Sequence, residues 1–429
     1  MELLRFSIPM ILGAVFQQMF SWADALIVGN FAGEQALAAI GTTNSCYNLL
    51  LDLILGASAG LTVLAARYYG AGNRERLHRL SVTYVRLAAV CSVLLAVAGI
   101  LFAGKLMTLL ETPAEILSDT VLYLRWLYGG LVFLGLYNIL AALLRAMGNS
   151  RAPFRAVIWA GLANIVLDWV FVAGLRMGVG GAAAATFLTQ GVMTLYLLAY
   201  VLRHEPFLLK GLRQEGTDWE LFREGMFYAL PLMLQGGAAS AGKVILTGFR
   251  NGFGVSVIAA ISTAYRVDTI LISPVRSLGA AIAAKVSQKL GAAEPEKARG
   301  VFRAGLVMSV CFAAVMTVFV RVFGNPLIGI FGVSAPVREM GAAFFRHLGQ
   351  FYAVCALMEA FHGFLQGCGD VRFTAGNMMF QLGLRIMLSY LLKAPLGWTV
   401  IAYAEGLSWC AAAGTGMLRC RIKLREITE

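Results

Sequence analysis

Two acidic residues stand inside apolar stretches of this sequence, where a charged side chain is costly. Asp24 follows Gln17 and Ser21 with helical spacing, so the three form one polar stripe on a helix. Asp168 follows Asn164 by four residues, which places both side chains on one helix face. Acids at bilayer depth mark, by default, a path for an ion or a substrate.

A depth estimate predicts that these acids meet. Asp24 and Asp168 each lie about seven residues before the outer end of a predicted helix, and Thr186 lies about eight residues after the outer start of the next one. All three are therefore on the order of 10–12 Å below the outer surface. With the Asn164 amide, this set suits a hard cation such as Na⁺. It equally suits a carboxyl pair that holds one proton. Asn138 lies deeper, as a further neutral ligand.

The alternative is that both acids only form hydrogen bonds between helices and so stabilise the packing of the bundle. No Lys or Arg of those helices neutralises Asp24 or Asp168 at that level. We therefore favour an ion-coupling site.

The composition is that of a membrane protein. Hydrophobic residues make up 59% of the 429 residues and charged residues 14%, with a mean hydropathy of +0.74, whereas soluble proteins carry about 25% charged residues. The net charge of +12 is spread over many short loops, so we expect lipid headgroups rather than nucleic acid as its partner. The seven cysteines show no CxxC pair or metal-ligand spacing and are interpreted as packing residues.

Twelve apolar segments are each long enough to cross about 30 Å of hydrocarbon as a helix. All must be helices, because lipid cannot satisfy an open backbone and no run alternates like a barrel strand. The first segment lacks a signal-peptide cleavage site, so we expect it to be retained. The segments are 6–31, 36–66, 82–104, 119–146, 153–175, 178–203, 222–249, 256–287, 299–322, 340–367, 372–393 and 396–420.

The distribution of Lys and Arg predicts the orientation. With the N-terminus inside, 22 basic residues fall on the inner side and 8 on the outer side. Because cytoplasmic loops carry the excess of Lys and Arg, we predict a multi-pass protein of the cell's inner (plasma) membrane with both termini in the cytoplasm.

An internal repeat relates the two halves of the chain at a constant offset of 221 residues. It places residues 38–40 (AAI) on 259–261 (AAI) and residues 148–151 (GNSR) on 369–372 (GDVR). Each half holds an even number of spans, so the halves are parallel repeats, which usually move against each other around a central cavity. The predicted parts are an N-lobe over 1–203 (helices 1–6), a cytoplasmic connector over 204–221 and a C-lobe over 222–429 (helices 7–12).

The second half does not repeat the acidic set. At the same offset Asp24 becomes Ile245 and Asp168 becomes Ser389. We expect the ionisable residues of this half mainly to neutralise one another inside the bundle, which leaves coupling to the first half. These residues are Lys243, Arg266, Asp268, Glu359, His362, Arg385 and Glu405.

Several motifs resemble the multidrug and toxic compound extrusion (MATE) transporters. They are PMILGAVFQQMFSWADALIVGNFAGEQALAAIG, RYYGAGNRE, LYNILAALLRAMGNSRAP, NIVLDWVF and GVGGAAAATFLTQ, then QKLGAAEPEKAR and LQGCGDVRF. The resemblance covers essentially the whole chain. It implies an all-α polytopic fold with two six-helix lobes in a V, and export of organic cations or amphipathic compounds in exchange for Na⁺ or H⁺. We expect a monomer, no cofactor besides the coupling ion, and a small-molecule substrate.

The resemblance also assigns residues. The family's N-lobe cation site falls on Asp24, Asn164, Asp168 and Thr186, with Asn138 nearby. Some members use an acid on helix 7, and that helix carries Lys243 and no acid inside the bilayer, which argues against a C-lobe Na⁺ site of that kind. The family's substrate cleft, and helix 10 beside it, implicate Gln17, Gln18, Asn44, Tyr47, Gln235, Tyr265, Asp268 and Glu359.

Two other functions compete with antiport. A flippase of the same superfamily, carrying a lipid-linked precursor or polysaccharide, would use a cation-rich cleft, for which Lys243, Arg266 and Arg276 are candidates. It does not explain the pairing of Asp24 with Asp168. A membrane-embedded enzyme would need clustered acids such as DDxxD or a His/Asp set at a membrane face, and the sequence has neither, so we expect no enzymatic activity.

Overall fold

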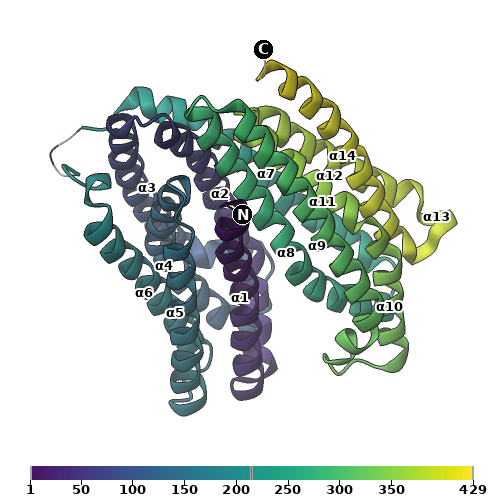
Figure 1. Cartoon of the computed structure of the whole chain (residues 1–429). Helices are drawn as coiled ribbons and strands as arrows, with labels where there is room; N and C mark the ends of the chain where they lie inside the picture. Colours follow the sequence, from purple (N-terminus) through teal and green to yellow (C-terminus); the bar gives the residue numbers. More distant parts are fainter. Residues whose placement is uncertain (1, 213, 215, 428–429) are drawn as a thin grey trace. The chain divides into compact units, whose positions relative to one another are not determined.

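The computed structural model describes residues 2–212, 214 and 216–427, apart from the side chains of Glu34, Leu37, Asn44 and Ser45. These residues form helices joined by short turns, and no β-strand occurs among them (Figure 1). The chain divides into two compact units, Val15–Ala229 and Met1–Ala14 with Leu230–Glu429.

The first unit is built around α4, which packs against α2, α3 and α6 (Figure 1). Its buried face is continuous because apolar residues line most of the helix from Leu124 to Leu144. The helices from the N-terminus onward are α1 (Glu2–Phe31), α2 (Gly33–Gly70), α3 (Arg74–Leu109), α4 (Ala114–Ala146), α5 (Arg151–Asp168), the π-helical turn η1 (Trp169–Gly174), α6 (Gly178–His204) and the 3₁₀ turn η2 (Pro206–Leu208).

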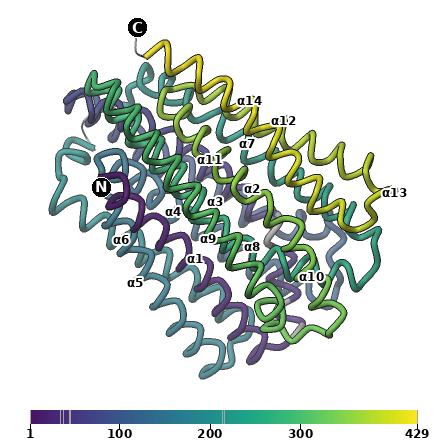
Figure 2. The backbone as a smooth tube through the Cα atoms, turned by 45° about the vertical axis from the view of Figure 1, so that its right-hand side comes forward, coloured from purple at the N-terminus to yellow at the C-terminus, as the bar shows by residue number. Residues whose placement is uncertain are grey.

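The second unit packs α8 against α9, α10 and α11, while α14 lies along α11 and α12 (Figure 2). The helices of the second half are α7 (Trp219–Asn251), α8 (Val255–Gly291), α9 (Pro295–Gly329), α10 (Ala335–Leu348), η3 (Gly349–Phe351), α11 (Tyr352–Gly367), α12 (Val371–Leu391), α13 (Lys393–Leu396), η4 (Gly397–Thr399) and α14 (Val400–Glu426).

The boundaries of the two compact units differ from those of the predicted lobes. Met1–Ala14, the start of α1, belongs to the second unit, and the described part of the predicted connector belongs to the first. The start of α7, up to Ala229, also belongs to the first unit. Helices α1 and α7 therefore each take part in both units.

Two predicted segments are interrupted. The segment 340–367 is split by the 3₁₀ turn Gly349–Phe351, where the Gly349 carbonyl accepts the Tyr352 backbone N–H and also a hydrogen bond from the Thr317 hydroxyl of α9 at 3.1 Å. The last segment begins with a separate short helix, α13, and Gly397 after it adopts a left-handed backbone with φ of 56°. The chain bends by 66° between α12 and the α13–α14 stretch.

Nine described helices are long and apolar enough to cross a membrane, and a tenth span is obtained when the bent α12/α13–α14 pair is counted as one. The 14-residue α10 and the 16-residue α11 are each too short alone. On α12, Asn377, Gln381 and Arg385 lower the mean hydropathy. Helix occupies all twelve predicted segments, so the prediction of an all-α polytopic membrane protein is confirmed.

Candidate functional site

The two acids of the first unit face each other. Asp24 lies in the last third of α1 and Asp168 is the last residue of α5, and their carboxyl groups lie within hydrogen-bonding reach. Asp168 is completely buried. Among the described residues, Asp24 Oδ1 and both oxygens of Asp168 have no donor. Two such carboxylates repel at close range, and one shared proton or a bound cation would relieve the repulsion.

The end of α5 explains how Asp168 is presented. The helix passes directly into the π-helical turn η1, which begins at Trp169. Such turns widen a helix locally and occur often at functional sites. Asn164 stands one turn before Asp168 and is half-buried, so its role as a ligand stays a prediction.

A tyrosine links the acids to α6. Tyr123 on α4 is 5% exposed, makes a side-chain hydrogen bond with Thr186, and lies within electrostatic reach of Asp24 and Asp168. The structure thus brings Asp24, Asp168 and Thr186 into one cluster and adds Tyr123. Sequence reasoning missed this tyrosine because it placed the helix start at residue 119, which puts Tyr123 too near the surface. In the structure α4 begins at Ala114, so Tyr123 lies about 14 Å along the helix.

The structure does not bring Asn138 into this cluster. It lies about 22 Å farther along α4 than Tyr123. Its amide donates to the Leu134 carbonyl at 2.8 Å, one turn back in the same helix. Its position along the helix axis is therefore enough to place it outside the acid cluster.

The predicted cleft residues of the first half have different environments. Tyr47 turns into the first unit, packs against the core cluster that contains Tyr123, and accepts a hydrogen bond from Gln190 at 3.1 Å. Gln17 is exposed and Gln18 half-buried. The side chain of Asn44 lies outside the described residues.

The polar centre of the second unit is a charge-compensated cluster. Arg385 on α12 donates to Glu405 of α14 and to the Tyr265 hydroxyl, each at 2.8 Å, and that hydroxyl donates to Glu405 at 2.7 Å. Arg250 stacks over the ring of Tyr265 at 5.0 Å. The acid here is therefore neutralised by a neighbouring guanidinium, as the sequence led us to expect for this half.

Other acids of the second unit have their own partners. Asp268 is buried and accepts a hydrogen bond from Tyr352 at 2.6 Å. Glu359 lies 3.9 Å from Arg276.

Gln235 of α7, a predicted cleft residue, is half-buried, and its Oε1 has no donor among the described residues.

His362 also belongs to the second unit. It contacts the Asn377 amide at 2.9 Å, so it and Glu359 have different partners although they stand one turn apart. Within the described part of the chain, no three His, Cys, Asp or Glu side chains converge as a metal site would require.

These features define a helical membrane protein with one uncompensated acid pair and one compensated acid cluster. A family model described as MatE matches residues 9–170 and 231–391. The match lies in both halves and covers most of the chain. The chain therefore belongs to the MatE family of multidrug efflux transporters; it is a transporter and not an enzyme.

Known relatives agree with this assignment. The chain is 27% identical over 418 residues to the probable multidrug resistance protein YpnP of Bacillus subtilis, covering 96% of this chain and 93% of the relative. It is 25% identical over 431 residues to the probable multidrug resistance protein NorM of Thermotoga maritima, covering 99% and 91%. An outward-facing multidrug resistance MATE family transporter of the MOP superfamily has the same fold, with a TM-score of 0.94 at 22% identity over 100% of this chain and 96% of that one.

Proposed function

We propose that this transporter is a secondary antiporter that exports organic cations or amphipathic drugs and metabolites in exchange for H⁺ or Na⁺. It works by alternating access of its two lobes, as a monomer in the cell's inner membrane with both termini in the cytoplasm. The observation that carries the coupling proposal is the pairing of half-buried Asp24 with buried Asp168, which leaves three of their oxygens without a donor among the described residues.

The pair supplies a switch in charge. With one proton or one Na⁺ bound, the excess negative charge is removed and the site tolerates an apolar environment. When the ion leaves, two carboxylates repel each other and attract a cationic substrate or the next ion. The hydrogen-bonded Tyr123 and Thr186 hold oxygen atoms beside the pair, where they stabilise the bound ion.

The second unit supports coupling by the first half alone. Arg385 neutralises Glu405, so this acid has no need of an exchangeable ion. We infer that the second unit serves as the moving partner and contributes substrate contacts.

Reconstitution in liposomes tests this function. Na⁺ and H⁺ gradients are imposed separately, and export of an ethidium-like dye is followed. One gradient should drive export in the native chain, and Asp24→Asn should remove the dependence on that gradient. A matched control is Asp119→Asn, which removes an exposed carboxylate from α4.

Three results would overturn the proposal. The first is that neither gradient drives dye movement, and the second is that Asp24→Asn leaves driven export unchanged. The third is that the chain scrambles a labelled lipid without any gradient, which would favour the flippase.

A further inference from the structure

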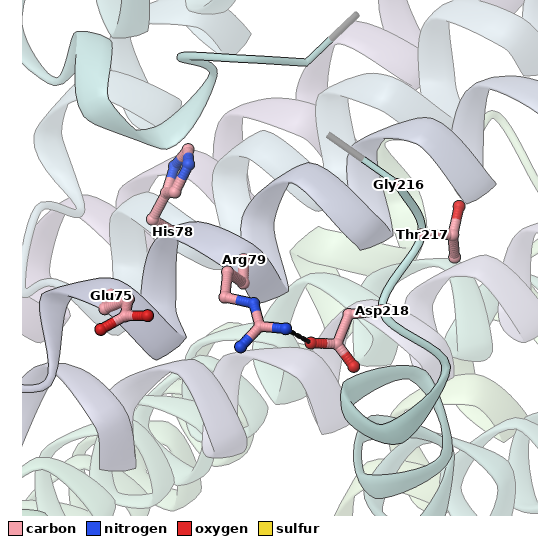
Figure 3. Close-up of a pocket in the computed structure, with 6 residues that line it drawn as sticks. All are labelled: Glu75, His78, Arg79, Gly216, Thr217 and Asp218. Atoms are coloured by element: carbon pink, nitrogen blue, oxygen red, sulfur yellow. Dashed lines mark ion pairs between the residues drawn. The ribbon is translucent and has the colours of Figure 1, made fainter. Parts of the chain in front are cut away.

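The start of α7 is bound to α3 within the first unit. The Asp218 carboxylate accepts hydrogen bonds from the backbone N–H groups of Glu220 and Leu221 at 3.1 Å, which begins the helix. Its other oxygen pairs with Arg79 of α3 at 2.7 Å (Figure 3). The Asp218 backbone N–H donates to the hydroxyl of Thr83 at 3.1 Å. These contacts fix where α7 starts.

The next two turns of α7 make polar contacts with α2. Tyr68, which is 8% exposed, donates its hydroxyl hydrogen to Glu224. Arg76 donates to the same hydroxyl at 3.4 Å, and Arg67 donates to the Tyr228 hydroxyl at 3.2 Å. The carboxylate of Glu224 is thus held by a hydroxyl with arginines around it.

Backbone contact accompanies these bonds. A Cβ placed on Gly60 of α2 would lie 2.5 Å from the Cα of Ala229, and one on Gly225 would lie 2.0 Å from the Tyr84 hydroxyl oxygen. Ala229 is completely buried. Only glycine permits so close an approach, and from Leu230 onward the same helix belongs to the second unit.

The second unit contains the corresponding arrangement at the start of α1. Lys285 of α8, which is 7% exposed, pairs with Glu2 at 3.0 Å and lies 5.0 Å from the ring centroid of Phe6. At the 221-residue offset α1 corresponds to α7 and α2 corresponds to α8. The same attachment therefore occurs once in each unit, with different residues.

Both attachments rest on charged and hydroxyl groups that water can replace. A single hydrogen bond contributes only about 0.5–1.5 kcal/mol net, because water competes for each partner. The polar contacts at the helix starts can therefore exchange with water, in addition to the close backbone packing at Gly60. When two units move against each other, helices change their contacts between discrete packed arrangements, and a helix that runs from one unit into the other is a natural place for such a change.

We propose that Tyr68–Glu224 and Glu2–Lys285 form an inner latch, which holds the starts of α7 and α1 on the side predicted to be cytoplasmic and releases them when the transporter opens to that side. The proposal rests on the alternating access of the proposed function. It assigns Glu224 and Lys285 a role distinct from the acid pair.

Thiol accessibility tests the latch without a transport assay. Ala229→Cys places a thiol in the closed contact with Gly60, and its alkylation rate by a maleimide reports how often the contact opens. Adding Glu224→Gln should accelerate alkylation roughly fivefold, because the Tyr68 hydroxyl then donates to a neutral acceptor instead of a charged one, a loss of about 1 kcal/mol. The buried native Cys355 serves as the reference for unfolding, and its rate should not change.

The control for charge is Glu220→Gln, an exposed carboxylate one turn earlier in α7. It should leave the alkylation rate of Ala229→Cys unchanged. Equal rates for the Glu224 and Glu220 variants would overturn the latch.

A cross-link tests the requirement for release. In Tyr68→Cys/Glu224→Cys, a short cleavable bismaleimide should stop gradient-driven dye export, and cleavage should restore it. The two single variants, treated alike, control for the native cysteines. Undiminished export after complete cross-linking would overturn the proposal. Failure of the native chain to export dye would refute the proposed antiport instead, and the alkylation rates would still decide the latch.

Discussion

Each unit carries a buried acid on one helix of a corresponding pair, Asp168 on α5 and Glu405 on α14, at positions that are not equivalent and with different partners. Helices α5 and α6 of the first unit correspond by the repeat to α12 and α14 of the second. In the first, Asp168 faces Asp24 and neither of its oxygens has a donor in the described part of the chain; in the second, Glu405 is paired with Arg385 at 2.8 Å. The position that holds Asn164 in α5 holds Arg385 in α12.

We propose that this difference, together with Ile245 and Ser389 at the positions that correspond to the two acids, separates an exchangeable site from a fixed one. A guanidinium beside a buried carboxylate satisfies its charge permanently, whereas an amide leaves the charge to be satisfied by an ion from solution. A duplicated scaffold can therefore keep its packing in both halves and confine ion exchange to one. The following changes test this contrast.

Asp168→Asn should have the largest effect. It removes the completely buried member of the pair and leaves Asp24 with no second carboxylate, so driven dye export should fall to background. The protein should still fold, because the amide is isosteric and adds a donor toward Asp24. Export and thermal unfolding are measured on the same preparation. Driven export at the native rate would show that Asp168 is structural.

Arg385→Met should mainly affect stability. It leaves Glu405 buried without a cation, which costs about 3–5 kcal/mol. The unfolding temperature in detergent should fall markedly, and Arg385→Met/Glu405→Leu should recover most of the loss. If the single variant is as stable as the native chain, Glu405 is not compensated by Arg385, and the contrast between the units fails.

Tyr123→Phe should have a smaller effect on coupling. It keeps the buried ring and removes the hydroxyl that bonds Thr186. Losing one hydrogen bond worth about 1 kcal/mol should weaken the apparent affinity for the coupling ion roughly fivefold. The ion concentration that gives half-maximal export is the readout. Tyr128→Phe, on the same helix, is the control and should leave that concentration unchanged.

The smallest effects concern a helix start that both halves share. Asn73 is the N-cap of α3, and its side-chain oxygen accepts the Arg76 backbone N–H at 3.0 Å. At the repeat offset Glu294 begins α9, and hydrogen bonds from Lys297 and Lys289 hold its pKa below the ordinary value of 4.5. Asn73→Ala should cost about 1 kcal/mol at any pH.

Glu294→Gln should cost less, because this side chain lies on the surface. A lowered pKa stabilises the fold at neutral pH, and that contribution is lost as the pH falls below 4.5 toward the folded-state value. The difference in unfolding temperature between native and Glu294→Gln protein should therefore shrink on acidification. A constant difference would mean that the carboxylate does not act through its charge.

The sequence predicted the fold class and part of the site. Apolar length and the repeat predicted the helices, since lipid accepts only a closed backbone. Depth counting grouped Asp24, Asp168 and Thr186, because rise per residue is constant in a helix. Tyr123 was missed because the predicted start of its helix was five residues late. Asn138 was placed near the acids although it lies deeper, because the sequence alone does not show which residues it contacts.

Side-chain direction and helix breaks could not be read from spacing. At the interruption, the Gly349 carbonyl accepts a hydrogen bond from Thr317 of another helix, and the inward-turned Tyr47 accepts one from Gln190 of α6. Neither partner is near in sequence. Such contacts are decided by which helices pack together.

The sequence by itself determined that this chain is a membrane protein, that it is a duplicated helical scaffold, and that its first half carries two acids in helices with no Lys or Arg at the same level. Only the tertiary structure decided that Asp24 and Asp168 face each other, that Arg385 satisfies Glu405, and that α1 and α7 each belong to two units. Hydropathy and periodicity are properties of single helices, whereas charge compensation depends on atoms brought within a few ångströms from helices far apart in the chain.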